Sequence, residues 1–129
     1  MDKSLERAVA VLGPLEGRIM RAVWSGAVAE PFVVRDVQAK TRGLAYTTVM
    51  TTLNRLAKKG LLTVRAVPQQ RAHEYRSVGS PANFLAAAGR HQAKQLVKRY
   101  GDAALAAFAA RLDELTPAQR DRLRRLVGR

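Results

Sequence analysis

The clearest amphipathic pattern along the chain lies in residues 45–60. Val49, Leu53 and Leu56 recur at helical spacing, and Gly60 continues the same apolar stripe. The opposite side of the predicted helix carries hydroxyls, an amide and cations, and it carries no carboxylate. Such a side suits the major groove of DNA, although a threonine-rich surface helix would show the same pattern. Its polar residues are Thr47, Thr48, Thr51, Asn54, Arg55, Lys58 and Lys59.

Two helices are predicted ahead of this segment. Pro14 suits a first helical position, where its missing N–H costs nothing, and a helix is expected from there to Trp24. Residues 34–41 can form a short second helix, with Gly43 where the chain favours a positive φ after a helix. Residues 1–12 leave a helix and a loose arm both open. The positions expected to face the core are Leu15, Ile19, Met20, Ala22, Val23, Trp24, Val34, Val37 and Ala39 or Lys40.

The period changes from helical to alternating after residue 60. Residues 62–67 predict one strand and residues 72–78 the returning strand, while residues 32–34 are a brief strand or an extended entry to the next helix. A short helix, a turn, a second helix and then a hairpin is the order of a winged helix-turn-helix. The hairpin residues expected near sugar-phosphate or the minor groove are Arg65, Gln69, Gln70, Arg71 and His73.

Three more helices are predicted in the last part of the chain. Ser80 is a plausible N-cap for a helix up to Tyr100, a second helix covers residues 103–112, and a capping box at Thr116-Pro117-Ala118-Gln119 starts the last one. Their apolar stripes need a cover, and a two-fold dimer is the commonest one. A helical subdomain that folds on itself is the alternative. The residues expected at the dimer interface are Leu96, Leu105, Phe108, Leu112, Leu123 and Leu126.

The charge of the chain strengthens the DNA-binding interpretation. The formal net charge is +13 over 129 residues, and no acidic residue lies between Asp36 and Glu74. Such a field attracts polyanions, nucleic acid first and an anionic membrane surface second. The absence of cysteine excludes disulfides and thiolate metal sites, and no stretch has the length of a membrane span. A cytoplasmic protein without membrane attachment is therefore expected.

Four stretches of the sequence resemble the BlaI/MecI, or penicillinase repressor, family of winged-helix repressors. The most specific is the run from Leu44 to Leu62, which contains AYTTVMTTLNRLAKKGLL, and the resemblance extends by pattern to about residue 127. The other three stretches are Leu12–Met20 with Val23-Trp24, Val34–Val37 and Arg71–Tyr75.

The resemblance implies a dimeric repressor that binds an inverted-repeat operator through its N-terminal domain and dimerises through its C-terminal helices. It implies that Tyr46, Thr47, Thr48, Thr51 and Arg55 face bases and adjacent phosphates, with Arg71 and His73 at the wing. It also implies a signal-activated protease as a possible partner, cutting at an Asn-Phe bond. The matching position here is Ala107-Phe108, and the missing asparagine weakens that expectation. A copper-responsive branch of the superfamily uses cysteines, which this chain lacks.

Other chemistry finds little support in the sequence. His73 and His91 have no partners at metal-ligand spacing, and no nucleophile motif or carboxylate pair suggests an enzyme. We therefore expect a mainly α protein that uses no metal or cofactor. Residues 1–80 are expected to form the DNA-binding domain and residues 81–129 the dimerisation domain. The alternatives are a non-specific architectural or nucleoid protein and a ligand-gated winged-helix regulator.

Overall fold

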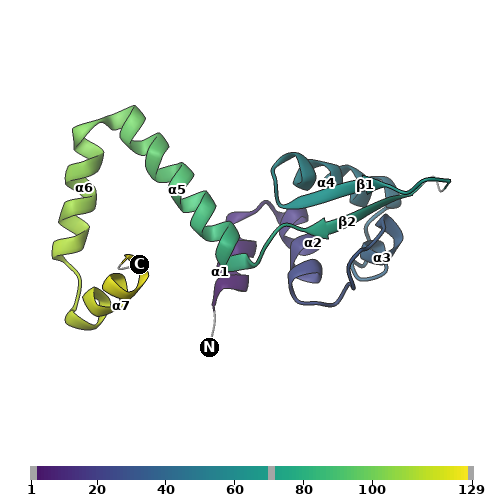
Figure 1. Ribbon diagram of the computed structural model, residues 1–129, viewed down its shortest axis with the longest axis horizontal. Coiled ribbons are helices and arrows are strands. Elements are labelled where there is room, and N and C mark those ends of the chain that lie inside the picture. Colours follow the sequence, from purple (N-terminus) through teal and green to yellow (C-terminus); the bar gives the residue numbers. More distant parts are fainter. Residues whose placement is uncertain (1–2, 70–71, 128–129) are drawn as a thin grey trace. The chain divides into compact units, whose positions relative to one another are not determined.

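The computed structural model describes residues 3–69 and 72–127 (Figure 1). The chain divides into two compact units, and the division falls between Ala87 and Ala88, within a continuous helix. The mainly helical fold with one small antiparallel sheet confirms the predicted fold class. In chain order the elements are α1 (Ser4–Val11), α2 (Pro14–Trp24), α3 (Val34–Gln38), α4 (Tyr46–Lys58), β1 (Leu62–Ala66), β2 (His73–Ser77), α5 (Pro81–Tyr100), α6 (Asp102–Asp113) and α7 (Pro117–Val127).

The core of the first unit forms where α2, α3 and α4 meet the sheet. The predicted stripe of α4 is fully buried at Val49, Leu53 and Leu56, which accounts for the position of this helix. Burying each such side chain contributes about 1.5–3 kcal/mol relative to leaving it in water. The buried residues of this core are Ile19, Met20, Ala22, Val23, Val28, Phe32, Val34, Val37, Val49, Leu53, Leu56, Leu61, Leu62 and Tyr75.

The connection between α3 and α4 is held by side-chain hydrogen bonds. The Thr41 hydroxyl is buried and donates to the Val37 carbonyl over 2.9 Å, while the Gln38 amide donates to the Leu44 carbonyl over 3.3 Å. Gly43 takes a φ of 82°, as its position predicted. The helix ends at Gln38, earlier than expected, so this connection is longer than the predicted turn.

The hairpin has a regular antiparallel register in which Val64 faces Tyr75 and Ala66 faces His73. Phe32 does not belong to a strand; it forms an isolated bridge to Tyr75, with backbone hydrogen bonds of 3.0 and 2.8 Å. The two aromatic rings also stack, with centroids 5.8 Å apart. The extended entry, one of the two interpretations of residues 32–34, is therefore the structure adopted.

Several predicted core positions are wrong. Leu15 is 37% exposed, whereas its neighbour Glu16 is buried. Glu16 precedes Ile19 and Val23 by one and two helical turns, so it lies on the buried side of α2, whereas Leu15 lies at the edge of that side. Ala39 and Lys40 are both exposed because α3 ends before them. Gly60 lies beyond α4, in a turn with a φ of 87°, and contributes nothing to the buried stripe.

The first residues of the chain form a helix, one of the two possibilities left open by the sequence. In α1, Ala8 is completely buried, and Gly17 of α2 allows a close approach to α1. A Cβ at that glycine would lie 3.0 Å from the Val9 carbonyl oxygen. The Glu6 carboxylate accepts a hydrogen bond of 2.8 Å from Arg21, which lowers the pKa of Glu6.

The start of α5 is anchored on α2 within the first unit. Trp24 donates from Nε1 to the Gly79 carbonyl over 3.0 Å, and its ring contacts Phe84 with centroids 5.7 Å apart. Ser80 is the predicted N-cap, because its hydroxyl accepts from the Asn83 N–H over 3.1 Å. These contacts fix the first turn of α5 to the helical core.

The second unit consists of the rest of α5 together with α6 and α7. Gly101 separates α5 from α6 with a φ of 61°. The predicted capping box of α7 is present: Thr116 and Gln119 exchange hydrogen bonds of 2.9 and 3.2 Å between side chain and backbone. Among the described residues 88–127, Ala104 alone is buried, so the monomer provides this unit with almost no core.

Candidate nucleic-acid interface

The outer side of α4 presents a row of exposed polar side chains. Thr47, Thr51, Arg55 and Lys58 are all exposed, and they follow one another at helical spacing. Neither cation of this row forms an ion pair within residues 3–69 and 72–127. The row therefore places hydroxyls beside positive charge, a combination that can contact base edges and phosphates in the major groove of DNA.

Two neighbouring threonines of α4 are less exposed to solvent than the residues of this row. Thr48 is half-buried, and Thr52 is buried with its hydroxyl donating to the Thr48 carbonyl over 2.7 Å. The hydroxyl of Thr52 is satisfied inside its own helix, as is common for threonine in a helix. Thr48 is predicted to face bases, but its side chain exposes less surface than the side chains of Thr47 and Thr51.

The first residue of α4 is held by an arginine that the sequence did not single out. Tyr46 is 42% exposed, and the Arg35 guanidinium of α3 lies 5.6 Å from the centre of its ring. This is a cation–π distance, so Arg35 both orients Tyr46 and adds a charge beside it. Residues 35 and 46 belong to different helices, and no periodic pattern could have predicted the pair.

Asn54 is exposed but has a partner within the chain. Its Oδ1 accepts a hydrogen bond of 2.9 Å from the hydroxyl of Tyr75 on β2. The Tyr75 side chain is otherwise buried, and this burial, together with Tyr46, raises the pKa of its hydroxyl. The amide predicted to contact DNA is therefore already used to join α4 to the hairpin.

Lys59 also has a partner within the chain. Its Nζ lies 3.0 and 2.9 Å from the two carboxylate oxygens of Glu16, on α2. The Glu16 side chain is only 7% exposed, so Lys59 provides the positive charge that this buried carboxylate needs. The two adjacent lysines at the end of α4 thus differ: Lys58 is exposed to solvent, whereas Lys59 forms an ion pair with Glu16 of α2.

Fewer of the residues predicted to contact DNA are exposed and unpaired on the described part of the hairpin than on α4. His73 is exposed at the start of β2, where it can donate to a phosphate. Arg65 is instead paired with Glu74 across the strands at 3.0 Å. Gln69 is exposed in the turn with a φ of 68°. Gln70 and Arg71, also predicted at the tip, lie outside the described residues.

The second unit exposes the side chains predicted to form a dimer interface. Leu96, Leu105, Phe108 and Leu112 are 40–53% exposed. At the end of the chain Leu126 is 73% exposed, while Leu123 is half-buried. Such exposure of large apolar side chains over a short chain is typical of an interface.

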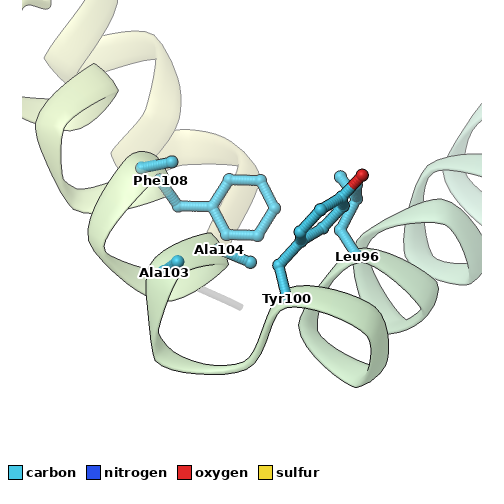
Figure 2. A pocket seen from close by; sticks show the side chains of 6 residues that line it. Leu96, Tyr100, Ala103, Ala104 and Phe108 are labelled. Atoms are coloured by element: carbon cyan, nitrogen blue, oxygen red, sulfur yellow. The ribbon is translucent and has the colours of Figure 1, made fainter.

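A hollow opens between the facing sides of α5 and α6. Figure 2 shows the rings of Tyr100 and Phe108 across it, with Leu96 beside Tyr100 and Ala104 below. Its volume is about 270 Å³. Ala103 and Ala107 complete a lining that is almost entirely carbon, so it suits an apolar side chain better than a polar metabolite.

The described residues form neither a metal-binding cluster nor a membrane-spanning helix. Within 3–69 and 72–127 no three histidine, cysteine or carboxylate side chains gather where a metal ion could bind. His91, one of the two histidines considered, is exposed on α5. In the part of the chain described here, no helix combines the length and apolarity needed to cross a bilayer.

Comparison with known proteins links the chain to one group of regulators. The family model described as penicillinase repressor matches residues 12–129. Two curated relatives, each called transcriptional regulator BlaI, come from the CDC 1551 / Oshkosh and H37Rv strains of Mycobacterium tuberculosis. Each is 49% identical over 70 residues, which are 52% of this chain and 48% of the relative. The chain thus spans about half the length of the curated relatives it matches.

Proposed function

Because this chain belongs to the penicillinase repressor family, we propose that it is a transcriptional repressor that binds a two-fold symmetric DNA operator as a homodimer. In this proposal residues 1–80 bind DNA and residues 81–129 hold the two subunits together. The single observation that carries it is the outer side of α4, where exposed hydroxyls lie beside two cations, Arg55 and Lys58, that form no ion pair within residues 3–69 and 72–127.

The α4 helix supplies base contacts in this proposal. Thr47 and Thr51 can donate to or accept from base edges, and their methyl groups can contact a thymine methyl. Arg55 has the geometry for a bidentate contact with guanine, while Lys58 suits a phosphate as a point charge. His73 on β2 provides a phosphate contact from the hairpin.

The second unit supports the proposal of a homodimer. Residues 88–127 bury only Ala104 among those described, and helices without a core are marginally stable in water. A second copy that covers Leu105, Phe108 and Leu112 would give both copies a shared core. Two α4 helices would then reach successive major grooves about 34–36 Å apart, and the operator would be an inverted repeat.

The Ala107-Phe108 bond matches the position at which the family's cleavage site would release the proposed repressor from DNA. Ala107-Phe108 lies on α6, and Phe108 is 40% exposed. Because the asparagine of the family's cleavage site is missing, we propose no cleavage at this bond.

Selection from a pool of randomised DNA duplexes tests the proposal. The full-length protein should enrich an inverted repeat, and at about 150 mM salt it should bind that duplex roughly 10³-fold or more tightly than random DNA. Equal binding to all duplexes would favour a non-specific architectural protein instead. The salt dependence would not separate the two, since both release counterions.

Three variants then test the role of α4. Thr51→Ala and Arg55→Ala should each weaken binding to the selected duplex by about 1–3 kcal/mol and change random-DNA binding much less. Lys58→Met should weaken both by a similar factor, because a phosphate contact carries no sequence information. A uniform loss in the first two variants would show that those side chains contact phosphates rather than bases.

A further inference from the structure

The hydrogen bond between Tyr75 and Asn54 links the two elements that would touch DNA. Asn54 lies on α4, and Tyr75 lies on β2 of the hairpin. The two residues are 21 positions apart, and their bond measures 2.9 Å. The bond therefore crosses from the helix to the sheet and does not belong to the local structure of either.

Tyr75 is held firmly at its own end of this bond. Its ring stacks on Phe32, and its backbone exchanges hydrogen bonds of 3.0 and 2.8 Å with the same residue. Tyr75 is 1% exposed, so burial leaves the hydroxyl few partners besides Asn54. A fixed donor of this kind holds the amide it bonds in one orientation.

This arrangement restricts what the Asn54 amide can do. An asparagine reads adenine through both ends of its amide at once, with Oδ1 accepting and Nδ2 donating. Here Oδ1 already accepts from Tyr75, and the orientation of the amide follows the sheet rather than an approaching base. The exposed threonines and Arg55 carry no such restriction within the described residues.

We propose that Asn54 and Tyr75 form a positioning pair that fixes the orientation of α4 relative to the hairpin, and that Asn54 does not read bases. The inference rests on the proposed function, since it assigns parts within the same DNA-binding surface. With the pair intact, α4 and the hairpin approach the major groove and the backbone as one unit. Without it, only the shared core fixes the angle between α4 and the hairpin, and the base contacts of Thr51 and Arg55 lose part of their alignment.

A double-mutant cycle tests the pair. Tyr75→Phe removes only the hydroxyl, Asn54→Ala removes the acceptor, and the third variant combines both changes. Each single variant should weaken binding to the selected duplex by about two- to tenfold, the range of one hydrogen bond, and should leave random-DNA binding nearly unchanged. The double variant should bind the selected duplex no more weakly than whichever single variant binds it less tightly, because both changes remove the same hydrogen bond.

A matched control separates positioning from loss of stability. Trp24→Phe also removes one hydrogen bond of an aromatic side chain in the first unit, the bond to the Gly79 carbonyl, and within the described residues Trp24 forms no hydrogen bond or ring contact with α4. At a temperature where all variants are folded, it should keep the wild-type preference for the selected duplex. Equal loss of preference in Trp24→Phe and Tyr75→Phe would overturn the proposal, because general destabilisation would then explain both.

Two further outcomes would also overturn it. If Asn54→Ala weakens selected-duplex binding equally in wild type and in Tyr75→Phe, while Tyr75→Phe alone has no effect, Asn54 reads bases directly. If neither single variant changes the preference, the bond does not position α4. Failure of the proposed function is visible separately, because wild-type protein would then enrich no sequence from the random pool.

Discussion

The adjacent lysines at the end of α4 should respond to the same substitution in opposite ways. Lys59 pairs with both carboxylate oxygens of Glu16, whose side chain is 7% exposed, whereas the Lys59 side chain is 52% exposed. Lys59→Met keeps the aliphatic stem and removes the charge. It leaves a buried carboxylate that has no other ion pair within the described residues.

The size of the effect follows from the burial of the two partners. Removing one partner of a fully buried ion pair costs about 3–5 kcal/mol, because an uncompensated charge remains inside. Lys59 is half exposed, so water weakens the pair, and we expect a loss of about 1–3 kcal/mol in the free energy of unfolding. For a unit of this size, 2 kcal/mol lowers Tm by about 8–16 °C.

Thermal unfolding followed by circular dichroism measures this loss, and Lys58→Met is the matched control. Lys58 is exposed, so its substitution should change stability by less than about 0.5 kcal/mol. In DNA-binding titrations the pattern should reverse. Lys58→Met should reduce the slope of log K against log salt by about 1, whereas Lys59→Met should leave the slope unchanged at a temperature where it is folded.

The combination of Glu16→Gln with Lys59→Met provides the last check. The neutral amide removes the buried charge, so the double variant should recover part of the stability lost by Lys59→Met alone. Equal Tm values for Lys58→Met and Lys59→Met would refute the argument that the pair stabilises the fold. A reduced salt slope in Lys59→Met would instead show that Lys59 reaches a phosphate.

Three further substitutions test other parts of the structure. Phe108→Asp should yield a monomer with a folded first unit in analytical ultracentrifugation, and a persisting dimer would contradict the assigned interface. Gly60→Ala should lower the free energy of unfolding in urea by about 1–2 kcal/mol, because the φ of 87° is unfavourable for alanine even though no atom lies near the added Cβ. Gly89→Ala, inside α5, is the control and should not lower it. Burial raises the pKa of Tyr75 above 10.0, so its contribution to stability is complete below pH 10 and is lost as the pH rises further. Tyr75→Phe should lack that alkaline loss in pH-dependent unfolding, and an unchanged pH profile would contradict the assignment.

Local patterns in the sequence predicted most of the helices and strands. The α2 helix has the predicted bounds, and α4 buries Val49, Leu53 and Leu56 as their spacing required. The caps at Ser80 and Thr116 are formed as expected. These features depend on residues within a few positions of one another, so the order of the sequence determines them directly.

The tertiary structure decides which polar side chains of α4 and its end have partners within the chain. The sequence grouped Asn54 and Lys59 with the residues that would contact DNA, and it predicted no partner for Glu16. Folding brings Glu16 to Lys59 across 43 positions and Tyr75 to Asn54 across 21. Periodicity shows which side of a helix is polar, but a hydrogen bond to another element depends on packing between segments distant in sequence. For this reason only the three-dimensional structure shows which polar side chains of α4 and its end already have partners within the chain.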